Sequence, residues 1–488
     1  MTTLSDHYFG DLEAFDEATL YPDFFKRTFI IPKSLGVSTL RNNRKFIIIG
    51  RKGTGKTAIQ MHLASIARDE GYMTHHFRFF YDLRSDDYKE ISQTQSKISY
   101  TGTINDKSLF LNYDFRDVWE RAFFRRIAET MRDRGIENAF TDLVAPRASR
   151  FSNIFAGLSR SLGIKITASM GPILAECNID PSEFSDKEGM PLKTFNRIAR
   201  ELFIKTSKGS KIYFFVDELV FSKLDAKEDE ITLRAAMVRD VLRTSWEING
   251  FFAVNKVDIH FICSLRPEVK QLISDFDTES GKFLDGKDVE LSWMAGDGDE
   301  AKLILEVLQS KVRFSLPEKE VEFEDFFAKT IKFGNRTDTI EEFLTKNTWG
   351  RPRDVVRLLN AIAKKNPNAN KIGEEEIKAS IHEYSRSSSK ELFDELGVKH
   401  GGAVLDALRK GIRKQVYRDS NQLWEDISPY LVSTNIKGLI EELFYLGVIG
   451  GYDPDKKRHY WVYRGNTYLH PSRKIRIHPA LWSEFQVQ

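Results

Sequence analysis

Residues 46–57 constrain the fold of this chain more than any other segment of the sequence. Phe46 to Ile49 form a short, fully apolar run, which is typical of a strand buried on both faces of a parallel sheet. The eight residues that follow, GRKGTGKT at positions 50–57, match the pattern GxxxxGK followed by Ser or Thr. Apolar residues near helical spacing then predict a helix over 58–70. A strand, a glycine-rich loop and a helix in this order predict a loop that wraps around phosphate groups.

Each fixed position of this loop has a chemical reason. Its glycines let the backbone curl so that N–H groups point at phosphate oxygens, and the next helix adds its positive dipole end. Lys56 is placed to reach the last phosphates of a nucleoside triphosphate, and the Thr57 hydroxyl to bind Mg²⁺. The predicted cofactor-binding residues are Gly50, Arg51, Lys52, Gly53, Thr54, Gly55, Lys56 and Thr57. The alternative is a strand-to-helix turn that binds no ligand.

A second apolar run, residues 211–216, ends in the carboxylates Asp217 and Glu218. In a nucleotide-hydrolysing site an aspartate at such a strand end holds the water shell of Mg²⁺, and the glutamate polarises the attacking water. Apolar strands that end in two acids are also common without this role. Beside the 50–57 loop, the pair predicts ATP hydrolysis, with Thr57 and Asp217 as metal-binding residues and Glu218 as the catalytic base.

The stretch 257–267 is typical of another inner strand, and Ser264 and Arg266 lie at its exit. Ligands of open α/β sheets bind beyond the carboxyl ends of the strands, so these two side chains are expected near the last phosphate. The alternative for Arg266 is an ordinary position in a surface loop.

Residues 349–360 predict a helix with Pro352 in its first turn. Either Arg351 or Arg353 is therefore a candidate to face the nucleotide from a lid helix. The alternative is a solvated helix with ordinary surface arginines.

Together, these motifs resemble those of the AAA+ ATPases, and most closely their origin-recognition-like and STAND branches. The 50–57 loop, GRPR at 350–353 and IHPA at 477–480 are also similar to a bacterial family of P-loop ATPases with a C-terminal winged helix. Some members of that family lie beside phage-defence genes. The resemblance covers about residues 1–82 and 205–488.

The resemblance implies ATP and Mg²⁺ as cofactors and a role for each motif residue. The implied roles are phosphate binding by Lys56, metal binding by Thr57 and Asp217, base catalysis by Glu218, and nucleotide sensing by Ser264, Arg266 and Arg353, with Arg351 as the alternative to Arg353. Ring-forming relatives also offer an arginine to the neighbouring subunit, but none occurs between Pro267 and Val312. This favours a switch that senses nucleotide within one chain, while Arg239 or Arg243 stays a candidate for a contact in trans.

The sequence Asn255-Lys256-Val257-Asp258 matches the string with which GTPases bind guanine. In GTPases the string follows a strand, whereas here it leads into one. The Asp-x-x-Gly of GTPases is also absent, because Val220 stands three residues after Asp217. ATP is therefore favoured over GTP.

We predict an α/β protein with a P-loop core of AAA+/STAND type built on a parallel sheet, a helical lid and a C-terminal winged helix. The predicted strands are 46–49, 74–80, 212–217, 258–264 and 288–292. The predicted domains are an N-terminal arm over 1–40, an ATPase core over 41–295 with an insertion at about 84–200, a lid over 296–385 and a winged helix over 391–488. Serines around 385–389 are compatible with a boundary or with a continuous helix.

In the last domain we predict a helix over 435–446 and a hairpin around residues 453–457. From residue 401 onward 13 Lys and Arg stand against 9 Asp and Glu, so a basic wing is suited to phosphates. Glu441 and Glu442 on the helix argue against reading of base edges. Nonspecific contact with DNA or RNA and contact with protein both stay open.

Composition limits the remaining classes. The net charge is +2, two cysteines exclude a disulfide framework, and the N-terminal residues do not form a signal sequence. No apolar run approaches the roughly 18 residues that span a bilayer, so a cytoplasmic protein without a membrane partner is expected.

The expected function is an Mg²⁺-dependent ATPase that acts as a conformational switch, forms homo-oligomers, and controls an effector or DNA contact in phage defence. No nuclease, deaminase or toxin motif is visible, so the effector is expected to be a separately encoded protein. The alternatives are a DNA-binding or scaffold protein with a structural ATP site, and a ring-forming ATP-driven DNA motor.

Overall fold

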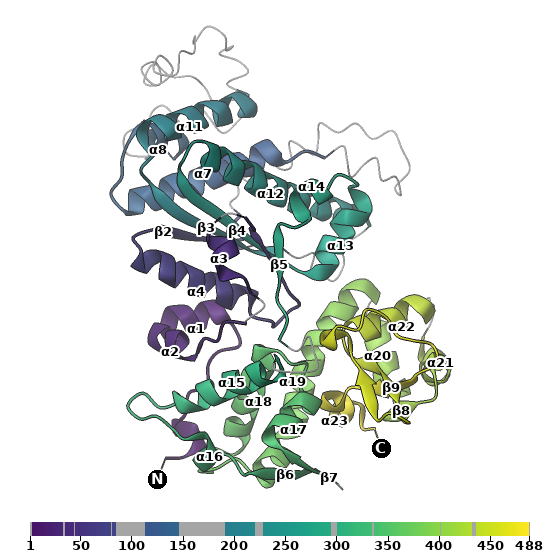
Figure 1. Cartoon of the computed structure of the whole chain (residues 1–488). Helices are drawn as coiled ribbons and strands as arrows, with labels where there is room; N and C mark the ends of the chain where they lie inside the picture. Colours follow the sequence, from purple (N-terminus) through teal and green to yellow (C-terminus); the bar gives the residue numbers. More distant parts are fainter. Residues whose placement is uncertain are drawn as a thin grey trace.

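The computed structural model in Figure 1 describes residues 2–32, 35–42, 44–79, 81–83, 113–145, 191–219, 228–293, 300–333, 336–400, 402–431 and 436–487. Its centre is a parallel sheet with the strand order β2-β3-β4-β1-β5. The strands are β1 (Ile47–Ile49), β2 (Met73–Arg78), β3 (Lys211–Leu219), β4 (Asp258–Leu265) and β5 (Asp288–Glu290). All five predicted strands are present, which confirms the α/β class with a parallel sheet.

Helices cover both faces of this sheet (Figure 1). On one face α4 (Lys56–Asp69) places Ile59 and Leu63 against Ile48 and Phe215. On the other face Phe214 stacks on Phe261 with ring centroids 4.6 Å apart. The helices of that face are α7 (Arg116–Asp133), α8 (Ala139–Val144), α11 (Leu192–Thr206) and α12 (Glu228–Val254), and α13 (Pro267–Phe276) and α14 (Gly281–Leu284) follow β4. Burial on both faces explains why these strands are continuous apolar runs in the sequence.

Most of the predicted insertion lies outside the described residues. Within and beside it the sequence also predicts a polar loop over 82–111, an amphipathic helix over 115–134 and a strand over 164–170. The loop, apart from residues 82 and 83, and the strand lie outside the described residues. The predicted helix is α7, which packs its apolar side chains against β2 and β3.

A helical region follows the sheet. Its elements are α15 (Glu300–Arg313), α16 (Phe323–Phe326), β6 (Thr330–Phe333), β7 (Arg336–Thr339), α17 (Ile340–Asn347), α18 (Pro352–Lys365) and α19 (Glu374–His400). Helix α19 runs without interruption through residues 385–389, where Ser385, Ser388 and Ser389 are buried. Their small side chains suit a helix that is packed closely against its neighbours, so the continuous helix is the arrangement found.

The N-terminal arm joins the two regions just described. It contains η1 (Leu4–Asp6), α1 (Ala14–Leu20), α2 (Pro22–Thr28) and α3 (Val37–Arg41). Leu4 and Phe9 belong to the core of the helical region, while the ring of Phe29 stacks on His62 of α4 at 4.3 Å. In Figure 1 α1 and α2 accordingly lie between the sheet and the helical region.

The C-terminal region has its own antiparallel sheet, with the order β10-β9-β11-β8. Its elements are α20 (Gly402–Gly411), β8 (Val416–Tyr417), α21 (Ser420–Ile427), η5 (Ser428–Tyr430), α22 (Ile436–Tyr445), β9 (Ile449–Asp453), β10 (Arg458–Tyr460), η6 (Val462–Arg464), β11 (Lys474–Ile477), η7 (Pro479–Leu481) and α23 (Trp482–Phe485). The predicted hairpin is formed by β9 and β10. Among the described helices of the chain, none combines the length and apolarity that a bilayer crossing requires.

Candidate nucleotide site

The three sequence motifs meet at the carboxyl edge of the central sheet. The 50–57 loop connects β1 to α4, and β3 and β4 end beside it with Asp217 and Ser264. The Thr57 hydroxyl donates a hydrogen bond of 2.5 Å to Asp217 Oδ2, and the Ser264 hydroxyl donates to Asp217 Oδ1. The sequence separation of Thr57 and Asp217 is 160 residues, so the sheet topology brings them together.

The backbone of the loop needs glycine at several of its positions. Gly53 and Gly55 have φ angles of 81° and 91°, which L side chains rarely adopt. A Cβ atom on Gly50 would lie 2.5 Å from the Thr54 hydroxyl. Trp293 Nε1 donates a 2.8 Å hydrogen bond to the Thr54 carbonyl and holds the loop from outside.

Lys56 points back into its own loop. Its ammonium group donates hydrogen bonds to the carbonyls of Gly50 at 2.7 Å and Arg51 at 3.1 Å. Burial and the positive charge of Arg266 lower the pKa of Lys56 to about 8. A buried ammonium next to another cation is a place where an anion gains binding energy, because the anion compensates both charges.

Glu218 has an unusual backbone and an unusual pKa. Its φ angle is 61°, and the pairing of β3 with β4 shifts register between Val216 and Leu219. The shift turns the half-buried Glu218 side chain toward the cavity next to the loop. Burial and the neighbouring Asp217 raise the pKa of Glu218 to about 7. Such a value suits a group that exchanges a proton near neutral pH.

A cavity of about 860 Å³ opens beside these groups. The predicted residues that line it are Lys52, Gly53, Gly55, Lys56, Thr57, Asp217, Glu218, Ser264, Arg266 and Arg353. Its other walls are largely apolar and come from distant segments, with Phe29 and Ile30 from the arm, Trp293 after β5, and Val307 and Val356 from the helical region. These wall residues were not predicted from the sequence, because an apolar side chain in an arm or helix carries no local pattern that indicates a binding role. The size matches that of small-molecule sites, which are about 300–1,000 Å³.

Three predicted loop residues, Gly50, Arg51 and Thr54, do not line the cavity. Arg51 instead reaches the C-terminal region, where it donates a hydrogen bond to the carbonyl of Tyr445. Its guanidinium also lies 4.5 Å from the centre of the Tyr445 ring. The predicted phosphate-binding loop is therefore in direct contact with the end of α22.

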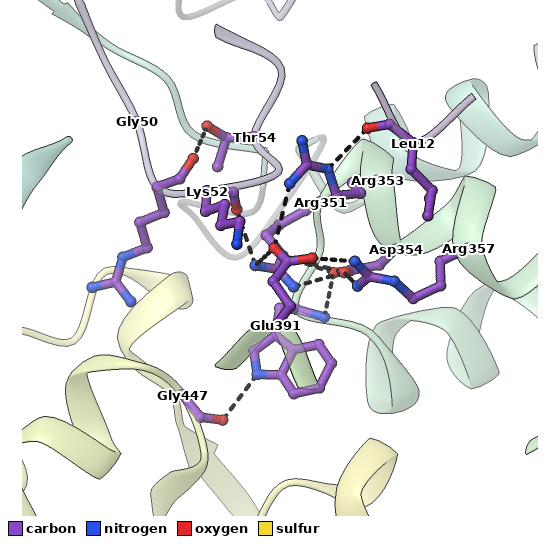
Figure 2. A network of polar contacts seen from close by, with 12 residues as sticks. Leu12, Gly50, Lys52, Thr54, Arg351, Arg353, Asp354, Arg357, Glu391 and Gly447 are labelled. Carbon is purple, nitrogen blue, oxygen red and sulfur yellow. Dashed lines mark hydrogen bonds and ion pairs between the residues drawn. The ribbon is translucent and has the colours of Figure 1, made fainter. Parts of the chain in front are cut away.

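The structure separates the two arginines that the sequence left open. Arg353 lines the cavity, whereas Arg351 is buried behind the loop. There Arg351 donates a 2.9 Å hydrogen bond to the Lys52 carbonyl and pairs with Asp354 at 2.8 Å. Figure 2 shows this network, in which Glu391 of α19 also takes part. Arg351 thus connects the start of α18 to the loop, and of these two arginines Arg353 is the one that a ligand can reach.

The residues just before α18 are tied to the C-terminal region. Trp349 Nε1 donates a 2.9 Å hydrogen bond to the Gly447 carbonyl (Figure 2), and its ring stacks on His478 with centroids 4.2 Å apart. Burial lowers the pKa of His478 well below its ordinary value, so this ring stacks in its neutral form. The loop, the start of α18 and the C-terminal region therefore form one continuous set of contacts.

Comparison with known proteins assigns one part of the chain. Residues 302–393 match the family model of the FunZ-associated C-terminal helical domain. This range begins in α15 and ends in α19, so it contains Arg351, Arg353 and Glu391. No curated protein matches the chain.

Proposed function

We propose that this protein is an Mg²⁺-dependent ATPase of the P-loop type that works as a nucleotide-driven switch. The observation that carries the proposal is the meeting of Thr57 and Asp217 at 2.5 Å, with Lys56 and Glu218 on the same cavity. A hydroxyl and a carboxylate in contact are two oxygen ligands that Mg²⁺ accepts, and it takes its others from phosphates and water. A strand-to-helix turn with a purely structural role would not need a hydroxyl, two carboxylates and an ammonium group on one cavity.

The residues divide the work of hydrolysis as follows. Lys56 leaves the carbonyls of Gly50 and Arg51 and binds the last phosphates, so that its buried charge is compensated. Thr57 and Asp217 would hold the metal, which would neutralise charge that develops on the phosphate oxygens. Glu218 accepts a proton from the attacking water. The adenine base lies against the apolar walls of the cavity.

A switch fits the positions of the arginines better than a ring motor does. Arg266 and Arg353 reach the cavity from the same chain. Arg239 is 2 % exposed and pairs with Asp240 at 2.7 Å, which removes it from the surface that a neighbouring subunit would need. Arg243 remains the candidate for a contact in trans, with Glu279 at 3.9 Å.

The C-terminal region supplies the part that would move. We infer that its helices α20, α21 and α22, with the β9–β10 hairpin, form a winged helix. Arg51 and Trp349 connect this unit to the loop and the lid, so a change in nucleotide alters its attachment. The proposed output is control of a separately encoded effector. The resemblance and the FunZ-associated match together favour phage defence as the setting.

The experiment is a binding and turnover assay with purified protein. We expect MgATP to bind, phosphate to be released, and Lys56→Ala to abolish both while the protein stays folded. Glu218→Gln should bind ATP but fail to release phosphate, and GTP should compete poorly with ATP. If the wild type bound ATP without releasing phosphate, the site would be structural; if Glu218→Gln released phosphate like the wild type, Glu218 would not be the base. Native mass measured with and without ATP separates a switch from a ring.

A second candidate function is nonspecific contact with nucleic acid, and one surface favours it. Residues 449–478 contain seven Lys and Arg but only two Asp and Glu, and residues 454–458 at the hairpin turn are exposed. The guanidinium of Arg473 lies 3.3 Å from the centre of the Tyr460 ring. Cations beside aromatic rings are suited to phosphates and bases. DNA or RNA binding that weakens with salt, and that Lys456→Glu with Lys457→Glu abolishes, is the expected result.

A further inference from the structure

Arg353 belongs to two environments at once. One side of it lines the nucleotide cavity together with Lys56 and Arg266. Its guanidinium is nevertheless engaged by the protein, with the Leu12 carbonyl at 3.1 Å and the carboxylates of Glu13 at 3.4 Å and Glu391 at 3.5 Å. A phosphate in the cavity would therefore have to compete for this arginine.

Glu391 is the better placed of the two carboxylates. The Glu13 side chain is 67 % exposed, whereas that of Glu391 is 8 % exposed and lies among Arg351, Arg353 and Arg357 (Figure 2). Burial by itself would raise the pKa of Glu391, but these arginines lower it to about 2. Glu391 is thus a permanent anion, and Arg353 is the one of its three partners that lines the cavity.

The position of Glu391 in the chain connects this competition to the C-terminal region. Glu391 lies in the second half of α19, which ends at His400, and α20 begins at Gly402. A ligand that breaks the Glu391–Arg353 contact therefore changes a contact of the helix that leads into the C-terminal region. Arg351 and Arg357 keep Glu391 paired when Arg353 is withdrawn, so the exchange does not leave an isolated buried charge.

We propose that Glu391 competes with the last phosphate of a bound nucleoside triphosphate for Arg353, and is thereby a positioning residue that sets the preference for ATP over ADP. This rests on the proposed nucleotide function. ATP presents the third phosphate that draws Arg353 away, and ADP leaves the Arg353–Glu391 pair in place. The Glu391 carboxylate on α19 is thus paired with Arg353 when ADP is bound and loses this partner when ATP is bound.

The test measures the ratio of the dissociation constants for MgADP and MgATP, using the whole chain. Glu391→Gln removes the competing charge and should raise this ratio about two- to fivefold, the range that one ion pair of this kind contributes. Glu383→Gln is the matched control, because Glu383 is also in α19 but pairs with Lys364 and Lys365, and none of the three lines the cavity. It should leave the ratio unchanged. A general loss of packing would weaken both nucleotides together and would not move the ratio.

Arg353→Gln tests the same pair without changing Glu391, and an unchanged ratio in this variant alone would also overturn the proposal. Arg353→Gln should lower the ADP/ATP ratio toward one, and Glu391→Gln in that background should have no further effect. An unchanged ratio in Glu391→Gln, or an equal change with and without Arg353, would overturn the proposal. If the wild-type protein bound neither nucleotide, the proposed ATPase function would fail instead, so the two failures are distinguishable.

Discussion

The rate of ATP hydrolysis should follow the ionisation of Glu218. The perturbation is a change of pH from 5 to 8.5, compared between the wild type and Glu218→Gln. Burial is the larger cause and the negative charge of Asp217 the smaller one, and together they raise the pKa of Glu218 from 4.5 to about 7. Only the deprotonated carboxylate accepts a proton from water, so activity is expected to fall as the pH falls through this pKa.

The magnitude follows from the two causes of the shift. A midpoint at 7 would leave about one tenth of the activity at pH 6, since each pH unit below the pKa reduces the base form about tenfold. A cation held by Asp217 would cancel the contribution of that carboxylate. Burial is the larger cause and remains in the loaded protein, so its midpoint is expected nearer to about 7 than to 4.5.

The assay is single-turnover hydrolysis of MgATP, with protein in excess and binding measured separately at each pH. Glu218→Gln should lower the rate about a hundred- to ten-thousandfold and remove the pH dependence over this range. The reasoning is refuted by a wild-type profile that is flat from pH 5 to 8.5 while ATP stays bound. A residual activity of Glu218→Gln close to that of the wild type would refute it as well.

Three other perturbations have expected outcomes. Lys56→Met should raise the free energy of unfolding of the nucleotide-free protein by about 1–3 kcal/mol at pH 7, measured by denaturant unfolding. The pKa of Lys56 is lowered from 10.5 to about 8, so its buried charge destabilises the folded state below pH 8, and this effect disappears as the pH rises toward 10.5. An equal or lower free energy of unfolding would contradict this. Gly53→Ala should cost about 1–2 kcal/mol and weaken ATP binding, since its φ is 81° and its Cβ would lie 3.3 Å from Arg353 Cβ, whereas Gly135→Ala, with a φ of 78° and open space, should cost stability alone. Arg51→Ala should loosen the C-terminal region, which faster hydrogen exchange in α22 would show, and unchanged exchange would mean that the Tyr445 contact contributes nothing.

Local sequence patterns were sufficient to predict the strands, the loop and the helix that form the candidate nucleotide site. Phe46 to Ile49 predicted a buried strand, the glycines of the 50–57 loop predicted its turn, and each depends only on neighbours within a few residues. The convergence of Thr57 with Asp217 was also predictable, because parallel strands bring their carboxyl ends to one edge of a sheet. For the same reason Ser264 was expected, and found, beside them.

Tertiary structure alone decided what surrounds that site. The choice between Arg353 and Arg351 depends on how α18 meets the loop, and two arginines separated by one proline have the same local signature. The contact of Arg51 with Tyr445 spans 394 residues, and that of Arg353 with Leu12 spans 341. Such pairs are set by the packing of whole helices, which involves many weak contacts at once. Local spacing carries hydrogen-bonding and periodicity information, but it does not carry the relative position of distant helices.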